Sequence, residues 1–484
     1  REKGTYHVYV RTYNWTSPWK KGEGPGKFSL SVGGKKLASP LGTEGTAWMW
    51  QVAGKVSVKN LRTVVKLHDL TGFDGRCDAI YFTTEEGRIP PSDMKQLEAF
   101  RRKALGFPDE APLAGQYDLV VVGAGIAGMS AAVSAARLGC KVALINDRPV
   151  IGGNNSSEIR VHLGGRIEEG VYKELGGLQK EFGPEKGGNA QPAENYEDQK
   201  KLDWLANEKN VTLFLNYRAI GVTKDGNKIT SVTARHIESG KEQKFEAPLF
   251  SDCTGDGTIG YLAGADFRMG REAKSEFGES IAPEKADKMT MGASVQWYSV
   301  DNGRSSSFPD FSYGVEFNDK NCEKVLMGEW TWETGMNLDQ IKDFERIRDY
   351  GMLVVYSNWS YLKNQMKENT QYRNRKLGWV AYVAGKRESR RLMGDYILKE
   401  DDITKNVTHE DASFATTWSI DLHWQDPANS AHFPGNEFKA VTKHILIHPY
   451  PVPYRCLYSR NIDNLFMAGR NISVTHVALG TVRV

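Results

Sequence analysis

Three glycines with the spacing G-x-G-x-x-G follow a continuous apolar run in the chain. Residues 117–122 have the hydrophobicity of a buried strand, the glycines are Gly123, Gly125 and Gly128, and a helical pattern continues to Leu138. In such a unit Gly123 permits a tight turn, Gly125 lets the backbone approach a pyrophosphate, and Gly128 lets the helix pack on the strand. The helix N-terminus would face the phosphate charge. The pattern predicts a dinucleotide site; the alternative is a glycine-rich packing turn.

The next apolar run, residues 141–146, predicts a second strand whose end would contact the adenosine ribose. An acidic residue normally accepts the ribose hydroxyls there, but this chain has Asn146, Asp147 and Arg148. The side-chain carbonyl of Asn146 can still accept a hydroxyl, and Asp147 is adjacent. We therefore include all three residues in the predicted cofactor site.

A second group of glycines, Gly152 and Gly153, and two later segments indicate which dinucleotide binds. LFSDCTGDG has the form of a strand followed by a Thr-Gly turn, and AGR lies near the C-terminus. Together they resemble the FAD-dependent oxidoreductases of the glutathione-reductase-like superfamily, in which such a turn marks the return from a substrate insertion. The resemblance implies further cofactor-binding residues: Gly152, Gly153, Asn155, Ser156, Thr254, Gly255, Asp256, Gly469 and Arg470.

Three longer motifs narrow the resemblance: RMGREAKSEFGES, GKRESRRLMGDYIL and YRCLYSRNIDNLFMAGRNISVTHVALGTVRV. They resemble a bacterial family of FAD-dependent oxidoreductases over most of residues 117–484. The resemblance implies an α/β Rossmann-like FAD-binding domain with an inserted α+β substrate domain at about residues 265–440, and noncovalent FAD. The last residues are apolar and strand-like, whereas the family continues with a helix facing the flavin. We therefore expect a C-terminal truncation that weakens FAD binding.

Two absent patterns restrict the chemistry. The sequence has no second strand–GxGxxG–helix unit, so electrons come from a substrate or an external donor. It has no C-x-x-x-x-C pair, which disfavours disulfide reductase chemistry. We therefore expect the flavin to face an organic substrate directly.

Candidate catalytic residues gather in the last part of the chain, where six of the ten histidines lie in the last 76 residues. Arginines would hold a substrate carboxylate or hydroxyls and stabilise negative charge on the flavin, and a histidine would remove a hydroxyl proton. The alternative is that most of these residues are structural or solvated. His444 and His448 would lie roughly 13 Å apart on a strand, too far for one metal ion, so we predict no metal site. The candidates are His423, His448, His476, Arg390, Arg391 and Arg455.

Residues 1–86 show short alternating strands separated by Gly, Pro and Asp, which predicts an all-β sandwich domain. Expected strands are 5–13, 28–32, 48–52, 56–58, 64–67 and 78–82, and a linker helix capped by Ser92 follows within residues 87–116. GTYHVYVRTYNW, GKFSLSVGG and LTGFDGRCDAIYFT resemble the carbohydrate-binding-like domain of golvesin and xanthan lyase. Trp15 and Trp19 are the rings expected on a sugar-stacking surface, and Asp69, Asp74 and Asp78 would serve turns or calcium.

Composition excludes some classes of function. Sixty-three Lys and Arg against 60 Asp and Glu give a net charge of +3 over 484 residues, too little to favour nucleic acid. No apolar run is long enough to cross a membrane. Five cysteines without C-x-x-C indicate neither a disulfide framework nor a zinc site. The chain starts without Met, so a removed signal peptide remains open and we expect a periplasmic or extracellular location.

These patterns together predict an FAD-dependent oxidoreductase that transfers hydride between noncovalent FAD and a saccharide or glycan-derived substrate. The expected partners are that small molecule or glycan and a polysaccharide bound by the first domain. Two alternatives stay open. One is reduction of an activated double bond, as in fumarate-reductase-like flavoproteins, and the other is a glycan-binding protein with a vestigial flavin fold.

Overall fold

The computed structural model describes residues 2–484, and these form two compact units. The first unit contains the chain up to Asp109 together with two later segments, Ser307–Cys322 and Leu353–Asn369. The second unit contains Glu110–Ser306, Glu323–Met352 and Thr370–Val484. The first unit is therefore discontinuous in sequence, unlike the continuous domain expected for residues 1–86.

Two three-stranded antiparallel sheets form the centre of the first unit. Val8, Val10, Leu30 and Val56 lie in the core that the two sheets share. The sheets have the orders β4-β1-β6 and β3-β2-β5, with β1 Gly4–Thr12, β2 Phe28–Val32, β3 Lys35–Lys36, β4 Met49–Val58, β5 Val65–Asp69 and β6 Ala79–Thr83.

Two local predictions for this unit need correction. The runs 48–52 and 56–58 form the single strand β4, because a register shift between Val8 and Tyr9 absorbs Ala53 without ending the pairing, and Gly54, with φ +142°, pairs with Val8 beside it. Helix α1 (Met94–Leu105) is capped by Asp93 rather than Ser92, with the Asp93 carboxylate accepting the Gln96 N–H.

An aromatic cluster joins the later segments to the first unit. Trp15 is completely buried, its indole N–H donates to the Phe73 carbonyl at 3.0 Å, and its ring stacks on Phe311 with centroids 6.4 Å apart. Tyr356 donates to Asp74 at 2.7 Å. The expectation that Trp15 is an exposed stacking ring was wrong, because segments distant in sequence cover it; Trp19 is half-buried.

The three aspartates of the same region serve protein contacts. Asp69 accepts the N–H groups of Thr71 and Gly72 in a turn, and Asp78 pairs with Arg11 at 2.7 Å. No cluster of potential metal ligands occurs among residues 2–484. The turn interpretation therefore holds for Asp69, whereas Asp78 is engaged in an ion pair and Asp74 accepts the Tyr356 hydroxyl.

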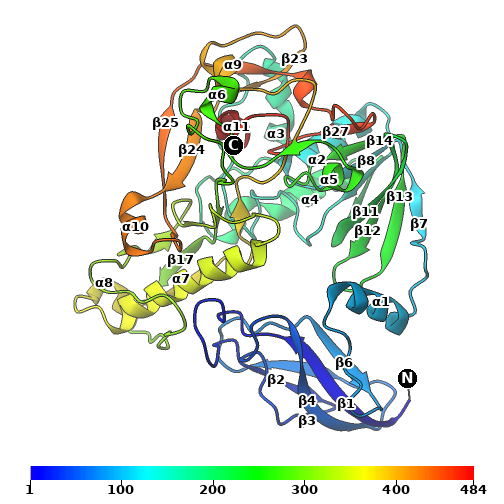
Figure 1. Ribbon diagram of the computed structural model, residues 1–484, viewed down its shortest axis with the longest axis vertical. Coiled ribbons are helices and arrows are strands. Elements are labelled where there is room, and N and C mark those ends of the chain that lie inside the picture. The colour runs from blue at the N-terminus through cyan, green and yellow to red at the C-terminus, as the bar shows by residue number, and fades with distance from the viewer. Residues whose placement is uncertain (1) are drawn as a thin grey trace. The chain divides into compact units, whose positions relative to one another are not determined.

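A five-stranded parallel sheet organises the second unit, as predicted from the apolar runs before and after the glycine motif. Val120, Val122, Ala143 and Phe250 are buried on it, which explains their continuous hydrophobicity. Figure 1 shows β8, β14 and β27 beside α2 and α5. The strand order is β10-β9-β8-β14-β27, with β8 Leu119–Val122, β9 Val142–Ile145, β10 Val211–Phe214, β14 Leu249–Asp252 and β27 Leu465–Met467.

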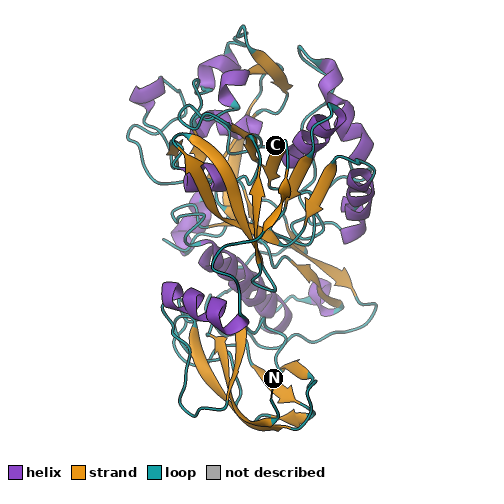
Figure 2. Cartoon of the chain, turned by 90° about the vertical axis from the view of Figure 1, so that its right-hand side faces the viewer, coloured by secondary structure: helices purple, strands orange, loops and turns teal. Residues whose placement is uncertain are grey.

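A four-stranded sheet and several short strand groups complete this unit (Figure 2). The chain returns to the parallel sheet only at β27, so the segment between β14 and β27 extends beyond the expected insertion of 265–440. The four-stranded sheet has the order β11-β12-β13-β7, with β7 Leu113–Gln116, β11 Tyr217–Asp225, β12 Lys228–His236 and β13 Glu242–Glu246. The short groups are β15 Phe267–Arg268 with β22 Arg391–Leu392; β16 Ala293–Ser294 with β19 Glu333–Thr334 and β21 Gly385–Lys386; β17 Trp297–Asp301 with β18 Met327–Gly328 and β20 Arg375–Val380; β23 Ala412–Thr416 with β26 Tyr450–Pro453; and β24 Ile420–Gln425 with β25 Ala440–Ile445.

The helices after α1 are mostly short, apart from α2 and α7. Helix α7 contributes to both units, since the division falls between Met352 and Leu353. The helices are α2 Ile126–Arg137, α3 Gly177–Phe182, α4 Asp198–Ala206, α5 Thr258–Ala263, α6 Lys274–Phe277, α7 Phe344–Asn364, α8 Thr370–Arg373, α9 Glu400–Thr404, α10 Pro427–His432 and α11 His476–Val482, with 3₁₀ turns η1 Lys173–Gly176, η2 Ala193–Tyr196 and η3 Tyr454–Cys456.

Helix α11 corrects the prediction of a strand-like run near residue 480. Thr475 caps it by accepting the Ala478 N–H at 3.1 Å, and Val477, Ala478 and Leu479 are buried. A short apolar run does not distinguish a buried helix from a strand, and here the capping threonine determines that the run is a helix.

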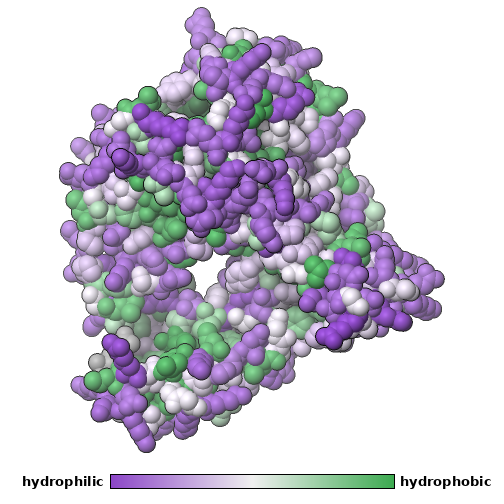
Figure 3. All heavy atoms as spheres, turned by 180° about the vertical axis from the view of Figure 1, so that it is seen from behind, coloured by the Kyte–Doolittle hydropathy of each residue, from purple (hydrophilic) through white to green (hydrophobic). Residues whose placement is uncertain are grey.

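Among the described residues, no helix is long and apolar enough to cross a membrane. Hydrophilic residues cover most of the face shown in Figure 3.

Candidate active site

The first glycine turn lies between β8 and α2. Gly123 has φ +102°, and a Cβ there would lie 2.2 Å from the Cys253 carbonyl oxygen; a Cβ on Gly128 would lie 1.8 Å from the Gly123 carbonyl oxygen. Both glycines are therefore required by the fold itself. A Cβ on Gly125 would meet only the Gly153 Cα, at 3.9 Å. The protein leaves open space above Gly125, at the N-terminus of α2.

The second glycine pair faces this turn. Gly152 forms an isolated bridge with Gly125, and both Gly152 and Gly153 have positive φ. Lys201 is completely buried, and its Nζ donates to the Asn155 carbonyl at 2.7 Å. This hydrogen bond holds the loop that follows Gly153 in place. The Asn155 side-chain amide donates to the Val161 carbonyl at 2.9 Å, while its buried Oδ1 has no hydrogen-bond partner in the described chain. That oxygen is available to a ligand.

Asn146 connects the two loops. Its Oδ1 accepts the Ala124 N–H at 3.2 Å, and its Nδ2 donates to the carbonyls of Arg148 and Val150 at 2.9 and 3.0 Å. Both amide hydrogens are thus used inside the protein, and the side chain sets the shape of the turn. Asp147 is exposed, so its carboxylate is the acceptor that remains accessible for a ribose hydroxyl.

Two cations share one carboxylate at the carboxyl ends of β14 and β27. Asp256 pairs with Lys386, and with Arg470 at 3.1 Å, and it accepts the Ser389 hydroxyl at 2.8 Å. Burial opposes ionisation of Asp256, but Lys386 and Arg470 outweigh it and hold its pKa well below the ordinary range. Burial also lowers the pKa of Lys386. The three groups carry one surplus positive charge.

Thr254 and Gly255 form the turn that presents Asp256. The Asp252 carboxylate accepts the Thr254 N–H and hydroxyl at 3.1 and 2.7 Å, and Gly255 has φ +70°. Ser156 donates to the Gly153 carbonyl at 2.7 Å, and Gly469 is left-handed at φ +92°. These residues shape the backbone of the turns rather than presenting free side chains.

A strap of residues 386–391 connects this charged group to a buried ionic cluster. Lys386 and Ser389 contact Asp256, whereas the intervening Arg387 and Glu388 contact different groups in the interior. The strap is held at both ends, because Asn154 donates to the Lys386 carbonyl at 3.0 Å and Arg391 lies in strand β22. The two groups of charges are therefore adjacent along one short segment.

His476 and Glu388 form the first buried histidine–carboxylate pair. The Nδ1 of His476 lies 2.9 Å from Glu388 Oε2, and the backbone N–H of His476 donates to Glu272 at 2.9 Å. Burial raises the pKa of Glu388, but His476 and Arg391 more than reverse this and lower it. Glu388 is therefore ionised and can only accept, so Nδ1 carries the hydrogen. Nε2 of His476 makes no hydrogen bond within the described residues.

Arg391 neutralises the carboxylates of this pair. Its side chain is completely buried, contacts Glu388, and donates to Glu272 at 2.6 Å and to the Gly270 carbonyl at 2.8 Å. A buried guanidinium with two carboxylates and a carbonyl is well compensated. Arg391 thus has a positioning role toward His476 through Glu388.

His423 and Glu333 form the second pair. Nδ1 of His423 lies 2.6 Å from Glu333, while Nε2 lies 3.2 Å from Arg483 and 3.4 Å from Asp421. Burial opposes ionisation of Glu333, but Arg387 and His423 lower its pKa to about 2. Both nitrogens of His423 are occupied by protein groups. His423 therefore has no free position for a substrate proton in this arrangement.

Consecutive backbone amides join the two pairs. The Met291 N–H donates to Glu388 at 2.8 Å, and the Gly292 N–H donates to Glu333 at 2.5 Å. A Cβ on Gly292 would lie 2.4 Å from the Thr334 carbonyl oxygen, so only glycine permits this approach. The two histidines belong to one buried network.

A family model described as FAD dependent oxidoreductase matches residues 118–484, about three quarters of the chain. The chain belongs to the FAD-dependent oxidoreductase family. The residues of the glycine turns fit FAD, the cofactor of this family: the space above Gly125 admits a pyrophosphate, and Asn155 Oδ1 and Arg470 Nε are buried polar atoms that lack partners in the described chain. No curated protein matches the chain.

Solved structures are similar to this chain over part of its length only. Mycobacterium smegmatis Sdh1 in complex with UQ1 is 20% identical, covering 30% of this chain and 34% of that chain, with a TM-score of 0.23. The myxobacterial chondrochloren halogenase CndH is 16% identical over 40% and 45% of the two chains, with a TM-score of 0.25. OxyS anhydrotetracycline hydroxylase from Streptomyces rimosus is 18% identical over 43% and 41%, with a TM-score of 0.27. The chain spans about a third of the length of Sdh1.

Three of the predicted catalytic residues of this flavoprotein lie outside the buried network. Arg390 stacks on Tyr261, with its guanidinium carbon 3.8 Å from the ring centroid. Arg455 pairs with Asp411 at 3.0 Å, and His448 is exposed in the loop between β25 and β26. These residues were candidates because of their type and their position in the sequence, and neither property specifies the direction of a side chain.

The structure adds flavoprotein site residues that the sequence interpretation missed. Some surround the histidines and others lie beside the cofactor turns. The only sequence signal was the unusual charge run 386–391 between apolar segments, since the partners lie far apart along the chain. The added residues are Lys201, Glu272, Glu333, Lys386, Arg387, Glu388, Asp421 and Arg483.

Proposed function

We propose that this flavoprotein transfers hydride between noncovalent FAD and the carbinol of a saccharide or glycan-derived compound, with His476 as the proton acceptor. The observation that carries the proposal is the pairing of His476 Nδ1 with the ionised Glu388. This pairing leaves Nε2 without a protein partner among the described residues. A carboxylate-oriented imidazole is a general base for a hydroxyl proton.

FAD would be held by the turns at Gly123–Gly128 and Gly152–Gly153, with Lys386 and Arg470 toward its phosphates. When bound, FAD supplies a two-electron acceptor or donor for hydride. Lys386 and Arg470 contribute positive charge while Asp256 keeps them in place. The exposed Asp147 would accept a ribose hydroxyl.

The chain's own groups manage the proton. Glu388 stabilises the imidazolium that forms when His476 accepts a hydrogen from the substrate hydroxyl, and Arg391 prevents Glu388 from taking that proton itself. The cluster is buried, so the interactions within it are stronger than they would be in water. The second pair, His423 with Glu333, holds the neighbouring backbone through Gly292.

The saccharide substrate is supported by the resemblance of residues 1–86 to the carbohydrate-binding-like domain of golvesin and xanthan lyase. A module that holds a polysaccharide near the enzyme raises the local concentration of glycan-derived substrates. Binding of a polysaccharide by residues 1–86 also favours a periplasmic or extracellular location, where polysaccharides occur.

The test is to incubate the purified, FAD-loaded protein anaerobically with a panel of neutral and acidic sugars. Reduction of the flavin is measured as the loss of the visible absorbance of its oxidised form. Reduction by a sugar, and its loss in His476→Gln, would support the proposal. Reoxidation of chemically reduced protein by unsaturated acids, with no reduction by sugars, would instead show double-bond reduction. Protein that binds no FAD would indicate a vestigial flavin fold.

A further inference from the structure

Positive charge is concentrated in the first part of the chain. Residues 1–86 contain 13 Lys or Arg against eight Asp or Glu, whereas the remaining 398 residues contain 50 against 52. The excess of cations is therefore carried entirely by the segment that forms the two small sheets. Such an asymmetry indicates an anionic partner for that segment.

Two of these cations, Arg62 and Lys66, line a hollow on the sheet β3-β2-β5. The hollow has a volume of about 530 Å³ and is formed by the β2–β3 turn, strand β5 and the loop that precedes β5. Ser31 lies on the central strand of this sheet, opposite Lys66 of β5 and Lys36 of β3 in the register of the three strands. A small side chain on the central strand between long side chains on both neighbours leaves a trough.

The lining of the hollow combines cations with neutral polar groups. Its side chains are Ser31, Asn60, Arg62, Thr63, Val64, Lys66 and His68. Ser31 Oγ lies 2.8 Å from His68 Nε2, which fixes the imidazole at the floor. No acidic side chain lines it, and neither Arg62 nor Lys66 makes an ion pair within residues 2–484. Two unpaired cations therefore face the same hollow.

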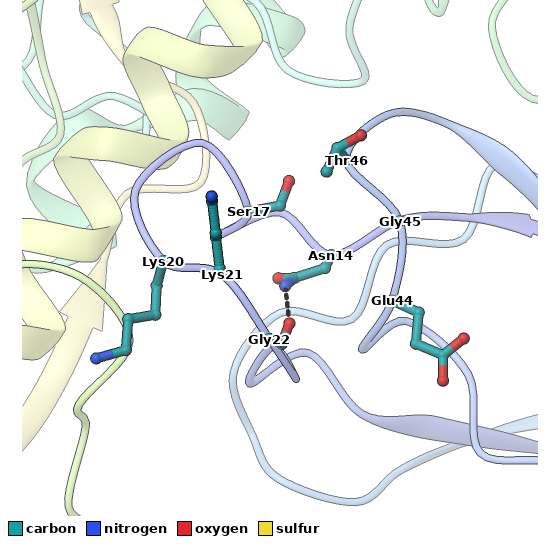
Figure 4. Close-up of a pocket in the computed structure, with 8 residues that line it drawn as sticks. All are labelled: Asn14, Ser17, Lys20, Lys21, Gly22, Glu44, Gly45 and Thr46. Carbon is teal, nitrogen blue, oxygen red and sulfur yellow. Dashed lines mark hydrogen bonds between the residues drawn. The ribbon is translucent and has the colours of Figure 1, made fainter.

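A second hollow on the same unit differs in charge. This hollow has a volume of about 350 Å³ and is lined by Asn14, Lys20, Lys21 and Glu44, among others. Asn14 donates to the Gly22 carbonyl at 3.1 Å (Figure 4). Here a carboxylate stands among the cations, so its net attraction for an anion is weaker. Variants in the second hollow therefore serve as controls for variants in the first.

We propose that the hollow lined by Arg62, Lys66 and His68 binds acidic polysaccharide through the carboxylate or sulfate groups of its sugar residues. Arg62 and Lys66 pair with the anionic group, Asn60 and Thr63 bind hydroxyls, and the exposed Val64 covers an apolar ring face. The inference rests on the proposed function, since it specifies the polysaccharide held by the first unit.

Shape favours a saccharide chain over a membrane surface. A bilayer is flat on the scale of this unit and would touch the rim cations without reaching Ser31 and His68 on the floor. A polysaccharide presents separate charged rings, each small enough to enter a hollow of this size.

The experiment measures retention of the full-length protein in native gels containing polygalacturonate, alginate or chondroitin sulfate, with neutral galactan as reference. We expect slower migration with at least one acidic polymer and at least a tenfold weaker effect in the double variant Arg62→Gln, Lys66→Gln. Added salt should weaken binding. The variant Lys20→Gln, Lys21→Gln removes the same charge from the second hollow and should bind like the parent.

Several outcomes would overturn the proposal. These are retention by none of the three acidic polymers, equal retention by galactan, equal losses in both double variants, or binding only to vesicles of phosphatidylglycerol. The double variant Arg62→Lys, Lys66→Arg keeps the charge and should keep most of the binding. FAD content and flavin reduction are measured separately, so failure of the oxidoreductase proposal is distinguishable from failure at this hollow.

Discussion

His476 presents Nδ1 to the Glu388 carboxylate at 2.9 Å, and its other ring nitrogen makes no hydrogen bond within the described chain. His423, by contrast, has both ring nitrogens in contact with protein groups. Of these two histidines in the same network, His476 is therefore the one with a ring nitrogen that has no hydrogen-bond partner among the described residues.

His476→Gln should lower the rate of flavin reduction by sugar roughly 10²- to 10⁴-fold, because it removes the general base and keeps a polar side chain of similar size. Stopped-flow absorbance of the FAD-loaded protein measures this rate. His448→Gln, which changes an exposed histidine, is the control and should react like the parent. Equal rates in His476→Gln and the parent would exclude His476 as the base.

Gly125→Val should abolish FAD binding while the protein still folds. A Cβ at this position meets no protein atom closer than 3.9 Å and requires no positive φ, so the valine side chain is directed into the space assigned to the pyrophosphate. Bound flavin is measured by absorbance after gel filtration, and folding by circular dichroism. Gly187→Val, in open space on an exposed loop, is the matched control. A yellow Gly125→Val protein would contradict the assignment.

Lys386→Met should weaken FAD binding about tenfold, or roughly 1.4 kcal/mol, because it removes one of the two cations that share Asp256. Fluorescence titration of the apoprotein with FAD measures the Kd. Lys376→Met, at an exposed position of β20, should leave it unchanged. Unchanged affinity in Lys386→Met would place the cofactor phosphates elsewhere.

Acid should destabilise the protein partly through Glu333. Its pKa is lowered from 4.5 to about 2, so its contribution to stability is complete above pH 4.5 and is lost as the pH falls toward 2. Denaturant unfolding at pH 6, 4 and 3 should therefore show a shallower acid loss for Glu333→Gln than for the parent, by up to roughly 2 kcal/mol at pH 3. Glu238→Gln, at an exposed turn, should follow the parent curve.

Trp15→Ala should reduce the free energy of unfolding by roughly 3–5 kcal/mol, because the ring is completely buried and stacks on Phe311. Urea unfolding followed by circular dichroism measures the change. Trp424→Ala removes an indole that is 41% exposed and should cost less than 1 kcal/mol. Similar losses in the two variants would contradict the aromatic cluster.

The cofactor turn was predictable because its information is local. Residues 117–128 contain a buried strand, a turn that demands glycine and a helix start, and each of these depends on neighbours in sequence. The alternation in β1 and β2 predicts the strands themselves, although both faces of β2 are buried in the structure. Conversely, Val477–Leu479 are apolar in a pattern too short to separate helix from strand.

The proton-handling residues were not predictable in pairs, because their partners are distant in sequence. Glu388 and His476 lie 88 residues apart, and Glu333 and His423 lie 90 apart. Residue type identified the histidines as candidates, but only packing determines which ring nitrogen remains free. Trp15 illustrates the same limit, since nothing near it in sequence indicates that Phe311 covers it.

The discontinuity of the first unit affects how the protein is made. Tyr356 contacts Asp74 across 282 residues, and a ribosome adding about 5–20 residues per second needs on the order of tens of seconds to span that distance. Until then the faces of Trp15 and Phe73 that later pack on Phe311 and Tyr356 are exposed on the growing chain. The N-terminal sheets therefore begin folding first but finish late, and during synthesis they are a natural target for chaperones that bind apolar surface.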